Sequence, residues 1–283
     1  MVTGLQNTIR KVQKKSSKTS LQNTKDIALS IQFSLDGFSF CITDTKRKEI
    51  VYFTSYLFDE TLKSPKDLLD EIKVIFNKDK NLQHDFSAIE VIHENYLSTL
   101  VPELYFNENS LQNYLSYTVK TFKNDFITYD SIDLIEAKNV YIPYVNINNY
   151  IFQNFGEFEY KHHHTILLQK LLSKKPSDEK VMYVNVAKNN FDIVVLEEEA
   201  VVFLNSFTYQ TKEDFLYHIL FTAEQLQLDT EEFQLMFLGA ISKNSDIYKI
   251  THNYVRNVSY LESKNEIFNN LELQNHSNYI LLG

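Results

Sequence analysis

The most conspicuous residues that could do chemistry are three consecutive histidines, His162, His163 and His164, which follow Glu157 and Glu159. Imidazole nitrogens and carboxylate oxygens are ligands that zinc takes in proteins. Three consecutive side chains on a helix, however, point about 100° apart, so they would not converge on one ion. The sequence therefore favours a polar helix start here, and we expect no metal site.

Other catalytic signatures are absent. Cys41, the single cysteine, alternates with Phe40 and Ile42 as in a strand, so it is predicted to be a small buried hydrophobic residue and no nucleophile. The patterns G-x-S-x-G, H-E-x-x-H and C-x-x-C do not occur. The chain has only five glycines, and neither a P-loop nor a dinucleotide-binding fingerprint is present. These absences exclude the commonest hydrolase and nucleotide-binding motifs.

The composition is that of an ordinary globular protein. Of 283 residues, 43% are hydrophobic and 23% are charged, which suits one large or two medium domains. The net charge of −9 argues against a general nucleic-acid binder. A single cysteine excludes an internal disulfide framework and fits a reducing compartment. Because no apolar run approaches the roughly 18 residues of a spanning helix, and no secretory signal is recognised, we expect no transmembrane segment and a cytoplasmic location. The oligomeric state stays open.

The elements that must position any site begin near residue 25. Residues 1–24 are basic and polar, so they are predicted to be a disordered or loosely docked arm. Alternating patterns predict strands at residues 27–33, 38–44, 49–53 and 88–92. Asp36-Gly37 is a strong hairpin signal between the first two strands. Ser64 followed by Pro65 predicts a helix start before the fourth strand. The order is β-β-β-α-β.

The same order returns in the second half of the chain. Strands are predicted at residues 181–186, 191–196, 200–204 and 233–238, and Thr211 is predicted to cap a helix that runs to about residue 226. Corresponding elements are separated by about 150 residues throughout. This near-constant spacing predicts a duplicated unit.

A helical and aromatic segment separates the two repeats. Helices are predicted at residues 108–122, 148–155 and 165–172, and strands at 133–136 and 139–143. The polar stretch 173–180 is the best linker candidate. We therefore expect three parts: the arm at 1–24, a first lobe at 25–175 with a helical insertion, and a second lobe at 176–283.

A β-β-β-α-β unit resembles the ribonuclease-H-like fold, and two such units in one chain resemble the actin-like ATPase superfamily, which includes the PilM and FtsA-type bacterial proteins. The segments 34–40 (S-L-D-G-F-S-F), 140–149 (V-Y-I-P-Y-V-N-I-N-N) and 221–226 (F-T-A-E-Q-L) resemble an uncharacterised bacterial family of the DUF3822 type with this fold. The resemblance implies an α/β protein with two ribonuclease-H-like lobes. It implies no particular reaction, because the family has none established.

The superfamily resemblance also implies where a phosphate site would lie. Actin-like ATPases carry an Asp-x-Gly on the first strand of each unit, where the Asp holds the metal with its waters and the glycine lets backbone approach phosphate. Matching the strands places Gln32 and Ser34 at the first triplet, and Asn185 and Ala187 at the second. Both acids are replaced by amides, which supply neither the charge nor the base that magnesium-dependent hydrolysis needs.

Two glycines bear on the same implied site. Gly239 matches half of the glycine pair that often contacts adenine in this superfamily. A shift of one or two residues would instead bring Asp36 and Gly37 to the phosphate position, although the hairpin gives that pair a sufficient structural reason. Seven positions are therefore our candidates for a degenerate binding site in the expected cleft between the lobes: Gln32, Ser34, Asp36, Gly37, Asn185, Ala187 and Gly239.

The sequence leads to a non-enzymatic hypothesis: a cytoplasmic pseudo-ATPase that serves as a scaffold or regulatory module for an unidentified protein partner. No cofactor is expected, although ATP could bind without a conventional magnesium site. The first alternative is accordingly a nucleotide-binding protein with weak or no hydrolysis. The second is a PilM-like protein that docks at the inner membrane, with the basic arm as the contact.

Overall fold

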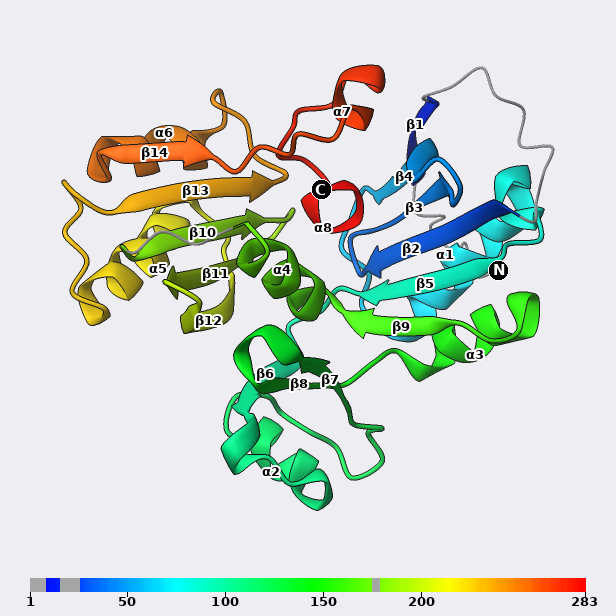
Figure 1. The fold of residues 1–283 in the computed structure, drawn as a ribbon, viewed down its shortest axis with the longest axis horizontal. Coiled ribbons are helices and arrows are strands. Elements are labelled where there is room, and N and C mark those ends of the chain that lie inside the picture. The colour runs from blue at the N-terminus through cyan, green and yellow to red at the C-terminus, as the bar shows by residue number, and fades with distance from the viewer. Residues whose placement is uncertain (1–8, 16–25, 175–178) are drawn as a thin grey trace, which may run out of the picture. The chain divides into compact units, whose positions relative to one another are not determined.

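The computed structural model describes residues 9–15, 26–174 and 179–283. By internal contacts the chain divides into two compact units. Unit 1 comprises the described residues of Met1–Ser131 and Ala137–Ile166, and unit 2 comprises those of Ile132–Glu136 and Leu167–Gly283. Each unit is built on its own β-sheet, as Figure 1 shows.

The main sheet of unit 1 has six strands in the order β1-β4-β3-β2-β5-β9. Their bounds are β1 Ile9–Lys15, β2 Ile27–Ser34, β3 Gly37–Asp44, β4 Glu49–Phe58, β5 Ala88–His93 and β9 Glu159–His162. The strands β2, β3 and β4 form an antiparallel meander, whereas β5 and β9 run parallel to β2. The carboxyl ends of these three parallel strands therefore lie at one edge of the sheet.

Two helices cover one face of this sheet, α1 (Pro65–Lys78) and α3 (Val145–Phe155), and they contact each other. As predicted, Ser64 caps α1: its hydroxyl accepts a hydrogen bond from the Asp67 N–H, and Pro65 stands in the first turn, where no N–H partner is lost. The apolar side chains of α1 and α3 pack on the alternating buried positions of β2 and β3 in one core.

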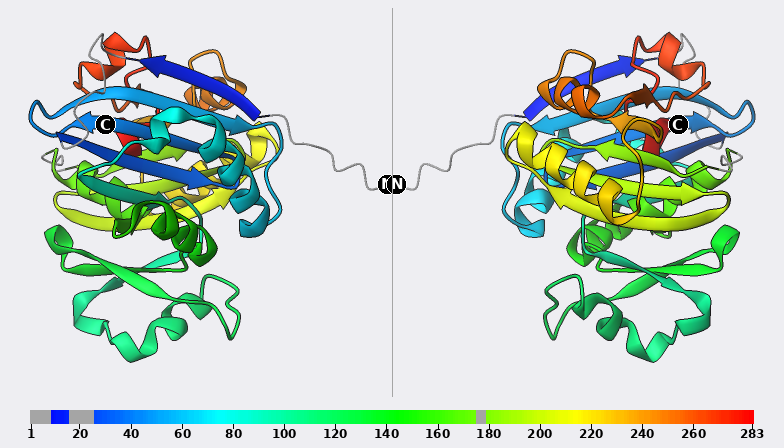
Figure 2. Two further views of the ribbon diagram at one scale, coloured as in Figure 1. Left: turned by 90° about the vertical axis from the view of Figure 1, so that its right-hand side faces the viewer. Right: turned by 90° about the vertical axis from the view of Figure 1, so that its left-hand side faces the viewer.

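A small three-stranded sheet, β6-β8-β7, is inserted between β5 and α3. It consists of β6 (Ser98–Pro102), β7 (Thr128–Ile132) and β8 (Ala137–Tyr141), with α2 (Leu111–Ser116) on one side (Figure 2). Short 3-10 turns complete unit 1: η2 (Lys80–Gln83), η3 (Glu103–Tyr105) and η4 (Glu108–Ser110).

Two predictions for this insertion are wrong. The helix expected over 108–122 is cut short at Ser116, because the segment packs around its own small core of Leu115, Val119 and Val140. The strand expected over 133–136 is the 3-10 turn η5 (Asp133–Ile135), which ends at Glu136 with a φ of +47°. This left-handed residue reverses the chain between β7 and β8, so no strand can continue through it.

The sheet of unit 2 has the order β12-β11-β10-β13-β14. The bounds of its elements are β10 Val181–Val186, β11 Asn190–Glu197, β12 Ala200–Thr208, α5 Lys212–Gln225, β13 Gln234–Gly239, α6 Asp246–Tyr254 and β14 Asn257–Tyr260. The remaining helices are α4 (His163–Leu172), α7 (Ile267–Asn270) and α8 (Tyr279–Leu282). Helices α5 and α6 pack together, and their apolar residues join the core formed by β10, β11 and β13. Among the described residues, every helix is shorter than a membrane-spanning helix needs to be.

The predicted duplication is confirmed element by element. In both units an antiparallel meander of three strands leads into a helix, and the next strand then pairs in parallel with the first: β5 with β2, and β13 with β10. The helix that corresponds to α1 is α5, and Thr211 caps it in a complete capping box with Asp214. Each unit thus has the ribonuclease-H-like order.

The basic arm differs from its prediction over the residues that the structure describes. Ile9–Lys15 form β1, which pairs antiparallel with β4 along its whole length. Residues 1–8 and 16–25 lie outside the described residues. The physical reason is that β4 would otherwise be an edge strand, whose unpaired N–H and C=O groups accept an added strand of almost any sequence. Main-chain pairing of this kind leaves little trace in the side-chain pattern.

Candidate functional site

The first group of candidate residues lies at the carboxyl edge of the parallel strands in unit 1. The register aligns Phe33 of β2 with His93 of β5, and His93 with His162 of β9. Gln32 lies opposite Ile92, and Glu94 follows two residues after Ile92, close enough for the side chains of Gln32 and Glu94 to meet. Such an edge is where open α/β sheets place their ligands.

Gln32 is paired with an acid that sequence reasoning missed. Its amide Nε2 donates a hydrogen bond to Oε2 of Glu94 over 2.8 Å. The other amide atom of Gln32, Oε1, is buried and has no hydrogen-bond partner among the described residues. The position that the sequence matched to the first phosphate site thus holds an amide that is hydrogen-bonded to a carboxylate, and one acceptor atom of this amide is unused.

Ser34, Asp36 and Gly37 build the β2–β3 hairpin. The Asp36 N–H donates to the Ser34 hydroxyl, and the Asp36 carboxylate accepts a hydrogen bond from Thr61. At Gly37 a Cβ atom would stand 2.7 Å from the carbonyl oxygen of Tyr56 on β4, so a side chain does not fit there. Each of the three residues therefore has a local structural role in the turn.

In unit 2 the second amide is also paired with an acid. Asn185 on β10 lies opposite Asp192 on β11, and its Nδ2 donates to Oδ2 of Asp192 over 2.9 Å. The Ser206 hydroxyl of β12 donates to the other carboxylate oxygen over 2.6 Å. Asn185 and Asp192 are both buried. The two repeats thus share an amide–carboxylate pair, although the acid comes from a different element in each.

Ala187 and Gly239 complete the candidates in unit 2: Ala187 directly follows the last residue of β10, and Gly239 is the last residue of β13. The Ala187 N–H donates to the carbonyl of Asn190 in the β10–β11 turn. Gly239 has a φ of +87°, and a Cβ atom there would lie only 2.3 Å from the carbonyl oxygen of Val186. The close pairing of β13 with β10 therefore requires glycine at 239, whether or not a ligand binds.

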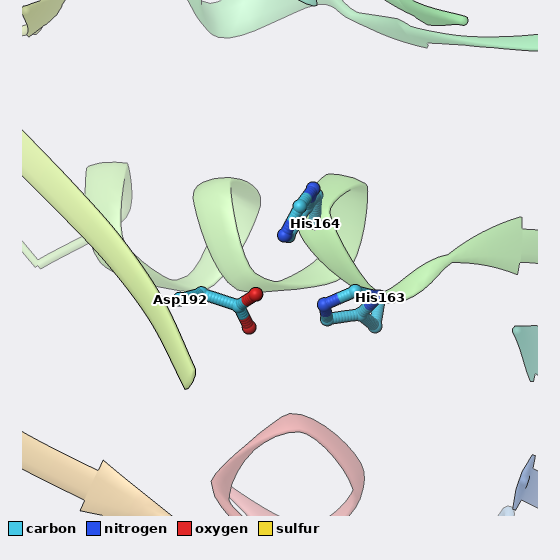
Figure 3. Close-up of side chains that lie close together, drawn as sticks. All are labelled: His163, His164 and Asp192. Carbon is cyan, nitrogen blue, oxygen red and sulfur yellow. The ribbon is translucent and has the colours of Figure 1, made fainter. Parts of the chain in front are cut away.

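The histidine run differs from its prediction. His162 ends β9 while His163 and His164 begin α4 (Figure 3), so the three residues are not on one helix, and all three are buried. Their ring centroids lie 4.1 to 4.9 Å apart. Nδ1 of His162 accepts from the His164 N–H, so its ring proton is on Nε2, which donates to the Asn95 carbonyl over 2.9 Å. His162 is therefore a structural, neutral histidine and not a polar helix start. Cys41 is buried, as predicted.

A third acid that the sequence did not single out, after Glu94 and Asp192, is Asp130, on β7. Its carboxylate accepts hydrogen bonds from the His162 N–H over 2.8 Å, from the Thr165 hydroxyl over 2.7 Å and from the Tyr141 hydroxyl over 3.0 Å. Burial raises the pKa of Asp130 and also that of Tyr141. Through these hydrogen bonds Asp130 connects the small sheet to the junction of β9 and α4.

Comparison with solved structures places the fold. A protein of Bacteroides thetaiotaomicron, described as having an actin-like ATPase fold and unknown function, matches with a TM-score of 0.78 and 20% identity over 87% of this chain and 94% of that one. A structure of the PilM–PilN type IV pilus biogenesis complex matches with a TM-score of 0.57 and 10% identity over 90% and 96%. The ethanolamine utilization protein EutJ from Carboxydothermus hydrogenoformans matches with a TM-score of 0.50 and 6% identity over 90% of this chain and 87% of that one. The fold is that of the actin-like ATPases.

The family follows from the sequence itself. The family model described as "Protein of unknown function (DUF3822)" matches residues 16–258, and the chain belongs to this family. No protein of the curated set matches the chain.

Proposed function

We propose that this protein is a non-catalytic member of the actin-like ATPase fold that acts in the cytoplasm as a scaffold or regulatory module and binds a protein partner. One observation carries the proposal: the residue at each phosphate position is an amide whose N–H group is hydrogen-bonded to a carboxylate of the same unit. An acid at position 32 or 185 would face that carboxylate directly, and the repulsion of like charges opposes it.

Protein binding is supported by a likeness within the fold. PilM was solved in a complex with PilN, and PilM has the fold of this chain. Exposed aromatic side chains on unit 1, described below, supply a surface for such binding. A PilM-like role at the inner membrane would use the basic side chains of the arm at 1–24 as well, and partner binding would then be lost when these side chains are replaced by glutamine, which leaves the main-chain pairing of β1 with β4 in place.

Hydrolysis is the direct test of the non-catalytic half of the proposal. Purified full-length protein with magnesium and ATP should release phosphate no faster than buffer. Turnover well above this background, abolished by Gln32→Ala or Asn185→Ala, would show that the amide positions still serve catalysis, and the proposal would be wrong.

Partner binding is tested separately. The protein, tagged and expressed in its native cell, is cross-linked and purified, and a partner is then reconstituted from purified components. The proposal expects a stoichiometric complex that forms without nucleotide and with Gln32→Ala. A partner that binds only with hydrolysable ATP would contradict it.

A second candidate, nucleotide binding without hydrolysis, is favoured by the unused acceptor Oε1 of Gln32. A bound donor such as an amino or hydroxyl group would satisfy it. Thermal unfolding with ATP, with and without magnesium, tests whether the protein binds the nucleotide. ATP at 100 times its Kd should stabilise the protein by about 2.7 kcal/mol. An unchanged Tm at millimolar ATP would exclude this candidate.

A further inference from the structure

Unit 1 carries an open groove of about 500 Å³ between α3, β9 and the loop that precedes β7. Its aromatic wall is formed by Phe126, Phe152, Phe158 and Tyr160, and its polar lining includes Asn148 and Glu157. We call this the aromatic groove. Its volume lies in the range of ligand pockets, which are typically apolar with a few well-placed polar groups.

The aromatic wall is exposed to a degree that core packing does not explain. The side chain of Phe126 is 53% exposed and that of Phe152 is 58% exposed. Phe158 and Tyr160, by contrast, are partly buried and pack on the main core. The groove therefore has a base of two partly buried rings, Phe158 and Tyr160, and two exposed aromatic side chains at its rim. Such an arrangement is typical of a surface that binds an apolar side chain.

One polar group of the groove is held in a fixed orientation from below. His93 is fully buried, and its Nδ1 accepts a hydrogen bond from the Tyr144 N–H over 3.1 Å. Its single proton is therefore on Nε2, which donates to Oδ1 of Asn148 over 2.9 Å. Burial lowers the pKa of His93 to about 4, so this direction holds at neutral pH. This hydrogen bond fixes which amide atom of Asn148 is the oxygen and which is the nitrogen, and the Nδ2 group is left to donate to a ligand such as a carbonyl oxygen.

The charge of the groove is negative. Of the described residues that line it, Glu157, which is exposed, is the one that carries a charge. Phosphate and carboxylate ligands would meet this carboxylate, and no described lining residue supplies a cation to balance it. A cationic side chain would instead be attracted by the Glu157 carboxylate and by the faces of the surrounding aromatic rings.

We propose that the aromatic groove binds a short extended peptide segment of a partner protein, in which an apolar side chain stands next to an arginine or lysine. The apolar side chain would lie between Phe126 and Phe152, the basic side chain would pair with Glu157, and a peptide carbonyl would accept from Asn148. The proposal rests on the protein-binding function argued above and names the surface and the chemistry of the segment.

A random library of short peptides displayed on phage, selected on the full-length protein, supplies the probe. Selected peptides are then synthesised with a fluorescent label, and their Kd is measured by anisotropy. The selection should enrich arginine or lysine beside a leucine, isoleucine or aromatic residue. Phe152→Ala should weaken binding by at least about tenfold, as expected for an aromatic anchor. If Phe152→Ala lowers the Tm, the Kd is measured with Phe126→Ala instead.

A charge swap and a matched control sharpen the result. Glu157→Lys should weaken the selected peptides by about tenfold, and a peptide whose basic residue is changed to glutamate should regain affinity for Glu157→Lys alone. Tyr217→Ala removes an aromatic side chain of similar exposure, 60%, from α5 of unit 2 and should leave the Kd unchanged.

Three outcomes would overturn the groove proposal. The first is that the selection yields no peptide, or acidic ones. The second is that selected peptides bind the Phe152→Ala and Phe126→Ala variants as tightly as the wild type. The third is a concentration-dependent dimer in sedimentation that Phe152→Ala dissolves, which would make a second copy of the chain the occupant. These results leave the hydrolysis test untouched, so failure of the groove and failure of the proposed function are distinguishable.

Discussion

The side-chain amide of Gln32 donates a hydrogen bond to the carboxylate of Glu94 over 2.8 Å, although the two residues are 62 positions apart. Asn185 and Asp192 form the corresponding pair in the second repeat. An amide can donate to a carboxylate and an ionised acid cannot. These pairs therefore give Gln32 and Asn185 a role in the folded protein that an ionised acid at the same position could not fill.

Gln32→Glu should destabilise the protein at neutral pH by about 1–3 kcal/mol, because two half-buried carboxylates would then face each other. One of the two would have its pKa raised in the folded state. The penalty is thus complete above that raised pKa and disappears as the pH falls toward the unfolded value near 4.3. Urea unfolding at pH 7 and pH 4.5 measures both effects.

The control for this variant is Gln153→Glu, on the exposed side of α3, which should change the free energy of unfolding by less than about 0.5 kcal/mol. If Gln32→Glu were as stable as the wild type at pH 7, the hydrogen bond to Glu94 would not contribute to the fold.

His93 should make the protein less stable as the pH is lowered. Burial lowers its pKa from an ordinary value of 6.5 to about 4, so the folded state holds the neutral ring. The loss begins as the pH falls below 6.5 and is complete near pH 4, and it amounts to about 3 kcal/mol at about 1.36 kcal/mol per pH unit. In His93→Gln the side chain cannot titrate, so the stability difference between pH 7 and pH 4.5 should be smaller. Equal differences in variant and wild type would contradict this.

Asp130→Asn should destabilise the protein by about 2–3 kcal/mol. The carboxylate accepts three hydrogen bonds, and an amide nitrogen in its place would face donors that it cannot pair with. Tyr141→Phe removes only one of these bonds and should cost about 1 kcal/mol. The midpoint of urea unfolding compares the two. An Asp130→Asn loss no larger than that of Thr118→Val, a change at an exposed threonine, would refute the role given to Asp130.

Gly239→Ala should be far more damaging than Gly156→Ala. Both glycines have a positive φ, +87° and +79°, so both variants carry backbone strain of about 1–3 kcal/mol. Only at Gly239 would the new Cβ atom also meet backbone, the carbonyl oxygen of Val186, whereas nothing lies within 4 Å of it at Gly156. We expect Gly156→Ala to fold with a lowered Tm and Gly239→Ala to be largely insoluble. Similar Tm values for both would show that β13 can move away from β10.

The local patterns in the sequence predicted the parts of the fold that local physics governs. Strand alternation, the hairpin at Asp36-Gly37 and the caps at Ser64 and Thr211 depend on residues within a few positions of each other. Their repetition at a near-constant spacing was enough to predict the duplicated unit. The strand expected at 133–136 was wrong because a left-handed residue, Glu136, has no local signal when it is not glycine.

The polar contacts of the candidate site could not be predicted in this way. Asp130 meets His162 and Thr165 from 32 and 35 positions away, and each contact depends on how two sheets and a helix are packed. The prediction for the three histidines is wrong for the same reason. A strand ends at His162 and a helix begins at His163, so the three rings do not have the helical spacing that the prediction assumed.

By itself the sequence determined the class of fold, its duplication and the amide side chains at positions 32 and 185, because these follow from residue type and regular spacing. The tertiary structure decided what those amides do instead, where Asp130 is buried, and that Phe126 and Phe152 form the rims of one groove. Such relationships arise only when distant segments pack, since a side chain's partners are set by the register of the sheets and not by its neighbours in the chain.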